Sequence, residues 1–260
     1  MNGMDDVNKH QTINENQTEI QEIEIIPAHG NIRKYLRKSW FIIKWALIAF
    51  FGSTLFFVVL FSFVNPPVTP LMIKRAFVKK PNGERAGIHK DWVSFRNISP
   101  SMIRAVVASE DNRFLEHWGI DVQAVQKAVE YNKKHRRKHG ASTITQQVAK
   151  NVYLWPARTW VRKGLELYFT VLIDAIWSKK RIMVVYLNVA ETGNGIYGVE
   201  AAARKYFHKP AAKLTRGEAA LIAAALPNPR VRNPAKPTAY LLRRQARIMN
   251  LMNKIGEIKF

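Results

Sequence analysis

The longest apolar stretch of the chain runs from Trp45 to Val64, twenty residues without a charge. About 20 apolar residues are enough for a helix to cross the hydrocarbon core of a bilayer. A buried helix of a soluble core is usually shorter and amphipathic. A cleaved signal peptide has an apolar region of roughly 7–15 residues and a small-residue cleavage site, whereas this stretch ends at Asn65-Pro66-Pro67. The pattern therefore predicts an uncleaved transmembrane anchor over 45–64.

The segments around this stretch differ in composition. Residues 1–30 are rich in Asn, Gln and Glu and poor in aromatic side chains, which is typical of a disordered tail. Residues 31–44 form a basic collar before the anchor. Residues 65–98 combine prolines with short apolar pieces and predict an irregular, membrane-proximal connector. From residue 99 to residue 260 the pattern is helical, and we expect one domain there.

Helix signals recur throughout this domain. Ser99 followed by Pro100 predicts a helix start, and capping-box patterns begin at Thr143 and Thr215. Apolar side chains at helical spacing follow these starts. Further helices are expected over 158–177, 179–188 and 239–255. Apart from a short piece within 71–95, no segment alternates as a strand does, so the predicted fold class is mainly α.

The distribution of charge predicts how the chain is oriented in the membrane and makes nucleic acid an unexpected partner. The formal net charge is +22, and residues 1–30 hold six acidic side chains and one Lys, so the excess positive charge lies on residues 31–260. The cations just before the anchor are Arg33, Lys34, Arg37, Lys38 and Lys44. This bias predicts a cytoplasmic N-terminus and a domain outside the inner membrane, where nucleic acid is not an expected partner. The chain has no Cys, which excludes disulfides and cysteine-based sites.

Glu110 is the first candidate for chemistry. It follows the apolar run 105–108, and a carboxylate that borders an apolar wall suits proton transfer. The alternative is a solvated acid at a helix end. Phe114, His117, Gly119 and Asp121 are expected to form a loop that turns back beside Glu110, in which His117 is a hydrogen-bonding structural residue.

Glu166 is the second candidate. On a helix it shares a face with Arg162 and Lys163, four and three residues earlier. Two cations with an orienting carboxylate suit phosphate oxygens or a metal ion, although surface ion pairs with this spacing are common. Lys150 would add another positive charge. Ser142, Thr143 and Gln147 supply uncharged donors at a helix N-terminus, where capping is the alternative role.

Two further segments predict a structure or a contact less specifically. The basic run 133–139 predicts a solvated loop, or a contact with lipid headgroups or a pyrophosphate. The glycine-rich stretch 193–198 follows no strand pattern, so a bend that lines a cleft is a better interpretation than a nucleotide-binding loop. The seven His residues show no metal-ligand spacing.

Four ordered motifs resemble those of the peptidoglycan glycosyltransferases. They are Glu110-Asp111-x-x-Phe114-x-x-His117-x-Gly119, Gly140-x-Ser142-Thr143-Ile144-Thr145-Gln146-Gln147-x-x-Lys150-Asn151, Arg162-Lys163-x-x-Glu166 and Ser178-Lys179-x-x-Ile182-x-x-Tyr186-Leu187-Asn188. The resemblance covers residues 95–230 and leaves no room for a transpeptidase domain, so a monofunctional member is expected. It implies a lysozyme-like helical domain with a small membrane-proximal lobe.

The resemblance also implies a reaction in cell-wall biogenesis. The donor is a glycan strand on undecaprenyl pyrophosphate, and the acceptor is lipid II. Glu110 would take the proton of the acceptor sugar 4-hydroxyl, whose oxygen inverts the donor anomeric carbon and expels the lipid pyrophosphate. Lys150, Arg162 and Lys163 match residues that bind the pyrophosphate or the following sugars. Glu166 matches a second essential glutamate that orients these cations or helps a divalent ion, Mg²⁺ or Mn²⁺.

The remaining implications concern binding and location. Cleft residues that match substrate-binding positions are Asp111, Ser142, Thr143, Gln147 and Asn151. Expected partners are lipid II, the lipid-linked strand, the membrane, and other cell-wall synthesis and division proteins. The expected location is the inner membrane, with one pass and the catalytic domain in the periplasm. Asp174 and Val184 stand where the family often has Glu, which leaves details of that helical region open.

Two other functions would fit parts of the pattern. A hydrolase or lytic transglycosylase would share the helical lobe and a catalytic Glu, but it has no need of Lys150, Arg162 and Lys163, because its leaving group is a sugar. A non-enzymatic scaffold could use the basic surface to bind anionic lipid or wall polymer, but it would not need both glutamates.

Overall fold

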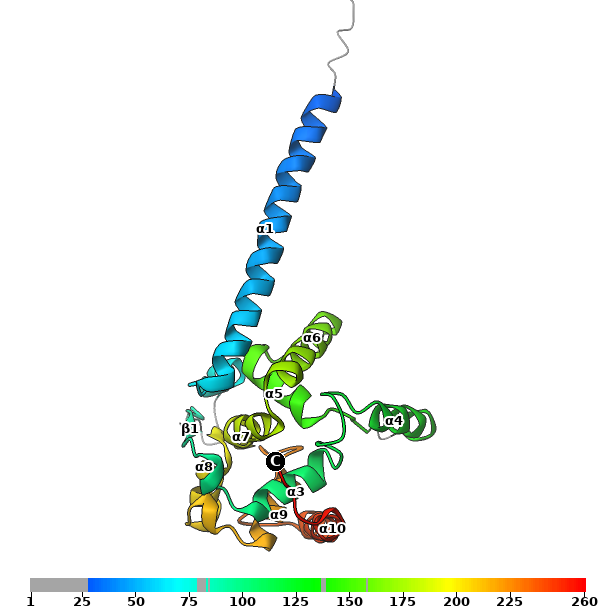
Figure 1. Ribbon diagram of the computed structural model, residues 1–260. Coiled ribbons are helices and arrows are strands. Elements are labelled where there is room, and N and C mark those ends of the chain that lie inside the picture. The colour runs from blue at the N-terminus through cyan, green and yellow to red at the C-terminus, as the bar shows by residue number, and fades with distance from the viewer. Residues whose placement is uncertain (1–27, 79–82, 84, 137–138, 158) are drawn as a thin grey trace, which may run out of the picture. The chain divides into compact units, whose positions relative to one another are not determined.

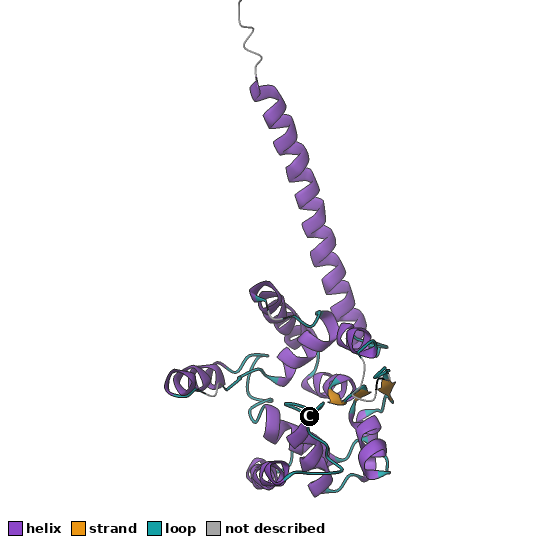
Figure 2. Ribbon diagram, turned by 180° about the vertical axis from the view of Figure 1, so that it is seen from behind, coloured by secondary structure: helices purple, strands orange, loops and turns teal. Residues whose placement is uncertain are grey.

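The computed structural model describes residues 28–78, 83, 85–136, 139–157 and 159–260 (Figure 1). Most of the expected tail, residues 1–27, lies outside this range, as do residues 137–138 of the basic run. The described chain is mainly helical, which confirms the predicted fold class. It divides into two compact units, with the boundary along the chain after Phe50. Strands, orange in Figure 2, occupy one small region of the second unit.

The expected collar and anchor form one continuous helix. Helix α1 spans Ala28–Phe63. Within the described residues, its segment 33–63 is the only helix long and apolar enough to cross a membrane. From Phe51 onward, α1 belongs to the second unit.

The last turns of α1 pack into the helical domain. Val58 is fully buried, and its carbonyl accepts a hydrogen bond from Trp177 Nε1 at 2.8 Å. The Arg181 guanidinium donates to the carbonyls of Phe61 and Val64 at 2.7–3.1 Å. These carbonyls lie at the end of a helix, where intrahelical partners run out. The end of the apolar helix is therefore part of the domain core.

The other helices follow the order that the sequence predicts. Their bounds are α2 Pro70–Ala76, α3 Pro100–Glu110, α4 Val122–Lys134, α5 Ile144–Tyr153, α6 Trp160–Ile176, α7 Lys179–Val189, α8 Val199–Phe207, α9 Arg216–Ala225 and α10 Ala239–Ile255. Both predicted capping boxes are present, at Thr143 and at Thr215. Ser99 makes no capping bond, because its hydroxyl donates to the Leu214 carbonyl at 2.9 Å instead.

Two groups of helices build the domain. Helices α3, α9 and α10 pack together, and α5 packs against α6 and α7. The buried face of α9 is mostly alanine, which lets neighbouring helices approach closely. Both views show α4 projecting to one side (Figures 1 and 2), and α4 has no buried residue. The ends of α3 and α5 meet between the two groups, and there the site is built.

The glycine-rich stretch is a small hairpin and not a simple bend. Strands β2 (Glu191–Gly193) and β3 (Ile196–Tyr197) are antiparallel, and β1 (His89–Lys90) of the connector pairs parallel to β3. Gly195 has φ +75°, and a Cβ there would lie 2.3 Å from the Ala86 carbonyl oxygen. Strands of two or three residues are too short to show the alternation by which a strand is recognised in a sequence.

Asn188 is fully buried and joins the connector to α7. Its Oδ1 accepts from the Val93 N–H at 2.8 Å, and its Nδ2 donates to the carbonyls of Val93 and Val184 at 3.0 and 2.8 Å. The amide thus binds three backbone groups at once, two of them on half-buried Val93.

We expect Asn188→Ala to lower the free energy of unfolding by about 3 kcal/mol, because it leaves the N–H and the carbonyl of Val93 without their side-chain partner. Denaturant unfolding of the full chain in detergent, followed by tryptophan fluorescence, measures the change. Asn97→Ala is the control, because Asn97 is exposed. Equal effects of the two substitutions would contradict the assigned role.

Candidate active site

Glu110 is the last residue of α3 and is held from α5. Gln147 Nε2 donates to Glu110 Oε2 at 3.0 Å, and Ser109 Oγ donates to Oε1 at 3.2 Å. The Tyr186 hydroxyl donates to Oε1 of the Gln147 side chain at 3.4 Å. Burial raises the pKa of Tyr186 well above its ordinary value, so the hydroxyl keeps its proton and can donate. Because the Tyr186 hydroxyl donates to Gln147 Oε1, the Gln147 side-chain nitrogen faces the Glu110 carboxylate.

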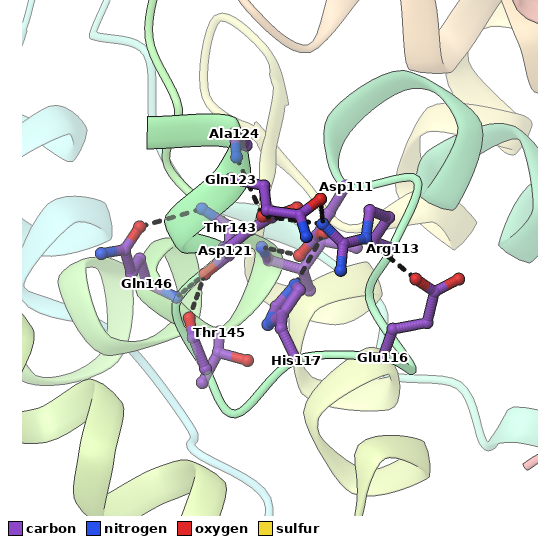
Figure 3. Close-up of polar contacts among 12 residues, drawn as sticks. Asp111, Arg113, Glu116, His117, Asp121, Gln123, Ala124, Thr143, Thr145 and Gln146 are labelled. Carbon is purple, nitrogen blue, oxygen red and sulfur yellow. Dashed lines mark hydrogen bonds and ion pairs between the residues drawn. The ribbon is translucent and has the colours of Figure 1, made fainter. Parts of the chain in front are cut away.

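The loop after Glu110 is fastened to the start of α5 (Figure 3). Asp111 Oδ1 lies 2.9 Å from His117 Nε2, and Asp111 Oδ2 accepts from the Ile144 N–H at 3.0 Å. The Thr143 hydroxyl donates to the Gly119 carbonyl at 2.5 Å. These contacts confirm that the loop turns back beside Glu110 and that His117 is a structural hydrogen-bonding residue.

Asp111, His117 and Asp121 also have their polar atoms within 4.8 Å of one another, an arrangement that could hold a metal ion. Both oxygens of Asp111 already have partners. Asp121 Oδ1 accepts from the Ala124 N–H at 2.9 Å, which caps α4. The three side chains therefore serve the loop and the helix start.

Glu166 and its two cations form a compact cluster near the start of α6. Arg162 Nη1 lies 2.6 Å from Glu166 Oε2, and Lys163 Nζ lies 2.5 Å from Oε1. The Glu166 side chain is 3% exposed, so this is not a solvated surface pair. The predicted common face is confirmed. Because both oxygens already carry a cation, the cluster as folded does not fit a divalent ion.

Lys150 connects the two acidic segments. It lies on α5 with surface open to solvent, yet the protein around its ammonium group lowers its pKa by desolvation. Glu166 and Glu110 both oppose this shift, and Arg162 and Lys163 add to it. The Lys150 ammonium group therefore interacts electrostatically with both Glu166 and Glu110.

The bonded residues Gln147 and Glu110 line two different cavities. A cavity of about 490 Å³ is lined by Leu71, Arg75, Gln147, Lys150, Asn151, Leu154, Trp155, Pro156, Ala157, Arg162, Tyr186, Ala190, Glu191, Leu226, Pro227 and Pro229. A second cavity of about 470 Å³ has Glu110, Ser142 and Thr143 in its lining, together with Lys127, Tyr131 and His139. We call them the cation cavity and the loop cavity.

The predicted residues divide between these cavities and the fold. Asn151 is buried and lines the cation cavity. Ser142 is exposed in the loop cavity, whereas Thr143 and Asp111 are buried and bonded within the fold. In the basic run, His135 and His139 stack on Tyr131 at 3.8 and 3.9 Å between ring centroids.

Sequence reasoning assigned no role in the site to three lining residues. Tyr186 lies within a quoted motif, but nothing local shows that it reaches Gln147. Arg75 belongs to the connector, and Glu191 opens a strand too short to recognise. Asp174, a departure from the family pattern, accepts from Lys179 Nζ at 2.7 Å, and Val184 is buried.

Comparison with known proteins gives a consistent result. The sequence profile of the family described as Transglycosylase matches residues 78–253. A biosynthetic peptidoglycan transglycosylase of Bdellovibrio bacteriovorus is 54% identical over 219 residues, which cover 83% of this chain and 88% of that protein. A protein with the same description from Bacteroides thetaiotaomicron is 54% identical over 224 residues, covering 86% and 89%. One from Salmonella schwarzengrund is 49% identical over 228 residues, covering 87% and 93%.

We expect Glu166→Ala to lower the free energy of unfolding by about 3 kcal/mol, because it leaves two neighbouring cations without their buried counter-charge. Glu116→Ala is the matched control, since Glu116 pairs with Arg113 at the surface with a 64% exposed side chain, and such pairs contribute about 0.5 kcal/mol. Urea unfolding of both variants in detergent makes the comparison. A loss at Glu166 no larger than at Glu116 would show that the cluster is effectively solvated.

Proposed function

The chain belongs to the transglycosylase family, and from this premise we propose how its two cavities divide the work of extending a peptidoglycan glycan strand. It is a peptidoglycan glycosyltransferase of cell-wall synthesis. The observation that carries the proposal is the position of Glu110, whose carboxylate lines the loop cavity while its partner Gln147 lines the cation cavity.

The cation cavity holds the donor, a glycan strand on a lipid pyrophosphate. Lys150 and Arg162 line it, and both present positive charge to phosphate oxygens. The loop cavity holds the acceptor, lipid II, with its sugar 4-hydroxyl against Glu110. Ser142 offers an exposed hydroxyl in the same cavity.

The transfer then needs one base and a stabilised leaving group. Glu110 accepts the proton of the acceptor hydroxyl as that oxygen attacks the donor anomeric carbon. The bond from this carbon to the pyrophosphate oxygen breaks on the opposite face, and the oxygen keeps the electron pair. The anomeric carbon is inverted. Lys150 and Arg162 stabilise the charge that develops on the leaving pyrophosphate.

Glu166 acts through its neighbours. It holds Arg162 and Lys163 at 2.6 and 2.5 Å and so fixes their positions before the donor binds. We assign no step to a divalent ion, since both Glu166 oxygens already bind these cations. Thr143 and Asp111 serve the site by fixing the loop and the start of α5, and Asn151 contributes to the wall of the cation cavity.

The apolar helix supports a membrane location. The basic residues that precede it favour a cytoplasmic N-terminus and a catalytic domain on the outer side of the inner membrane. Near the start of α6, Trp160 is 92% and Val161 is 71% exposed. Exposed apolar side chains in a domain that contains the end of the membrane helix suit contact with lipid, where a lipid-linked substrate lies.

We expect Glu110→Gln to reduce polymerisation of lipid II by about a thousandfold, because the amide cannot accept the proton. Strand formation from fluorescent lipid II in detergent measures the rate, and thermal unfolding and lipid II binding should stay near those of the unchanged protein. Glu116→Gln is the control, since that carboxylate is exposed in the surface pair with Arg113. Turnover above a tenth of the normal rate would remove Glu110 from the role of base.

Donor binding should weaken as pH rises through the lowered pKa of Lys150, because the neutral amine no longer attracts the pyrophosphate. Lys150→Arg should move this loss to higher pH, since a guanidinium keeps its proton. The pH dependence of KM for lipid II shows the shift, with Lys254→Arg on the last helix as the control. An alkaline limb that is the same in all three proteins would assign the titration to another group.

A further inference from the structure

The cation cavity has a second polar region apart from its cations. Arg75, in the last turn of α2, and Glu191, the first residue of β2, both line it. Neither belongs to the motifs from which the reaction was deduced. The two side chains come from segments more than a hundred residues apart in the sequence.

The polar atoms of this region are buried but poorly satisfied. Arg75 Nε and Glu191 Oε2 are 3.9 Å apart, too far for a hydrogen bond. Arg75 Nε, Glu191 Oε1 and Tyr197 Oη are three of eight buried side-chain atoms without a hydrogen-bond partner within the described residues. Tyr197 is fully buried and lies directly opposite Glu191 in the β2–β3 pairing.

Unsatisfied buried polar atoms cost free energy, and a group of them calls for an explanation. The Glu191 side chain is 11% exposed, and burial raises its pKa. A structural ion pair would close to hydrogen-bonding distance, as Arg162 and Glu166 do at 2.6 Å. The looser pair at Arg75 leaves a donor and an acceptor without partners on two residues that line the cavity.

The balance of charge indicates what this wall can bind. Lys150 and Arg162 line the cavity with positive charge, so their part of it suits an anion. Arg75 and Glu191 cancel each other, and Arg230, which also acts on Glu191, is exposed to solvent. A neutral group that both donates and accepts hydrogen bonds fits the second region better than another phosphate.

We propose that Arg75 and Glu191 form a subsite for an uncharged polar group of the donor sugar, a hydroxyl or an acetamido group. Arg75 donates to its oxygen, and Glu191 accepts from its O–H or N–H. The proposal rests on the assignment of the cation cavity to the donor, and it adds recognition of the sugar to recognition of the pyrophosphate.

The test compares two ligands on the full chain in detergent. One is lipid II, and the other is a polyprenyl pyrophosphate without sugar. Glu191→Ala should weaken lipid II binding about tenfold, the usual effect of losing one hydrogen bond to a charged group. It should leave binding of the sugar-free pyrophosphate unchanged. Arg75→Ala should show the same preference for the sugar-bearing ligand.

Three variants make the result interpretable. Lys150→Ala should weaken the binding of both ligands. If it weakens the binding of neither, the assignment of the cation cavity to the donor fails, independently of the subsite. Glu191→Gln keeps the side-chain shape and should show a smaller loss for lipid II alone, which guards against misfolding of the Ala variant. Glu218→Ala, which removes a carboxylate bound to Lys209 and to the start of α9, should change neither affinity.

Other outcomes overturn the subsite. Unchanged lipid II binding in Glu191→Ala and Arg75→Ala would mean that the unsatisfied atoms bind only solvent. Weakened sugar-free pyrophosphate binding in Arg75→Ala would make Arg75 another phosphate ligand. Tighter binding of that ligand in Glu191→Ala would show that the carboxylate only repels the pyrophosphate.

Discussion

The carboxylate of Asp111 is the constraint on which the cleft depends. One oxygen accepts the Ile144 N–H at the start of α5, and the other lies 2.9 Å from His117 Nε2. A buried carboxylate needs such partners, and a helix N-terminus with free N–H groups is a favourable one. This single side chain therefore brings the end of α3, the loop after it and the start of α5 to one place. Glu110 and Gln147, the neighbours of these contacts, meet as a consequence.

Charge is arranged differently at the two glutamates. Glu166 is buried and bound by two cations, so it works by holding Arg162 and Lys163. The hydrogen-bond partners of Glu110 among the described residues, Gln147 and Ser109, are neutral. The hydrogen bonds to Glu110 come from a neutral amide and a neutral hydroxyl, whereas each oxygen of Glu166 is bound by a cation. This difference in partners supports the separate roles that we propose for the two glutamates.

The last turns of α1, the helix long and apolar enough to cross a membrane, belong to the core of the domain. Val58 is buried among domain residues, and Arg181 satisfies carbonyls at the end of α1. Arginine suits this role because its planar group donates to several oxygens at once. The last turns of the apolar helix are thus bound to the same helix α7 that carries Tyr186 and Asn188.

Local rules explain what the sequence determined by itself. The uncharged stretch 45–64, the capping boxes and the shared face of Arg162, Lys163 and Glu166 depend on residues a few positions apart, so they could be predicted and are confirmed by the structure as a long apolar helix, two capped helix starts and a buried ion cluster. The ordered motifs also pointed to the family and to its reaction.

Tertiary structure alone decided the contacts between distant segments. Gln147 reaches Glu110 across 37 positions, Asn188 reaches Val93 across 95, and Arg75 faces Glu191 across more than a hundred. The small sheet is a further example, since its third strand, β1, comes from the connector and pairs with β3. Each such contact depends on how helices pack, and packing is set by the sum of many small apolar contacts. A local pattern therefore identified the chemical groups, and only the packed fold determined which of them act on one another.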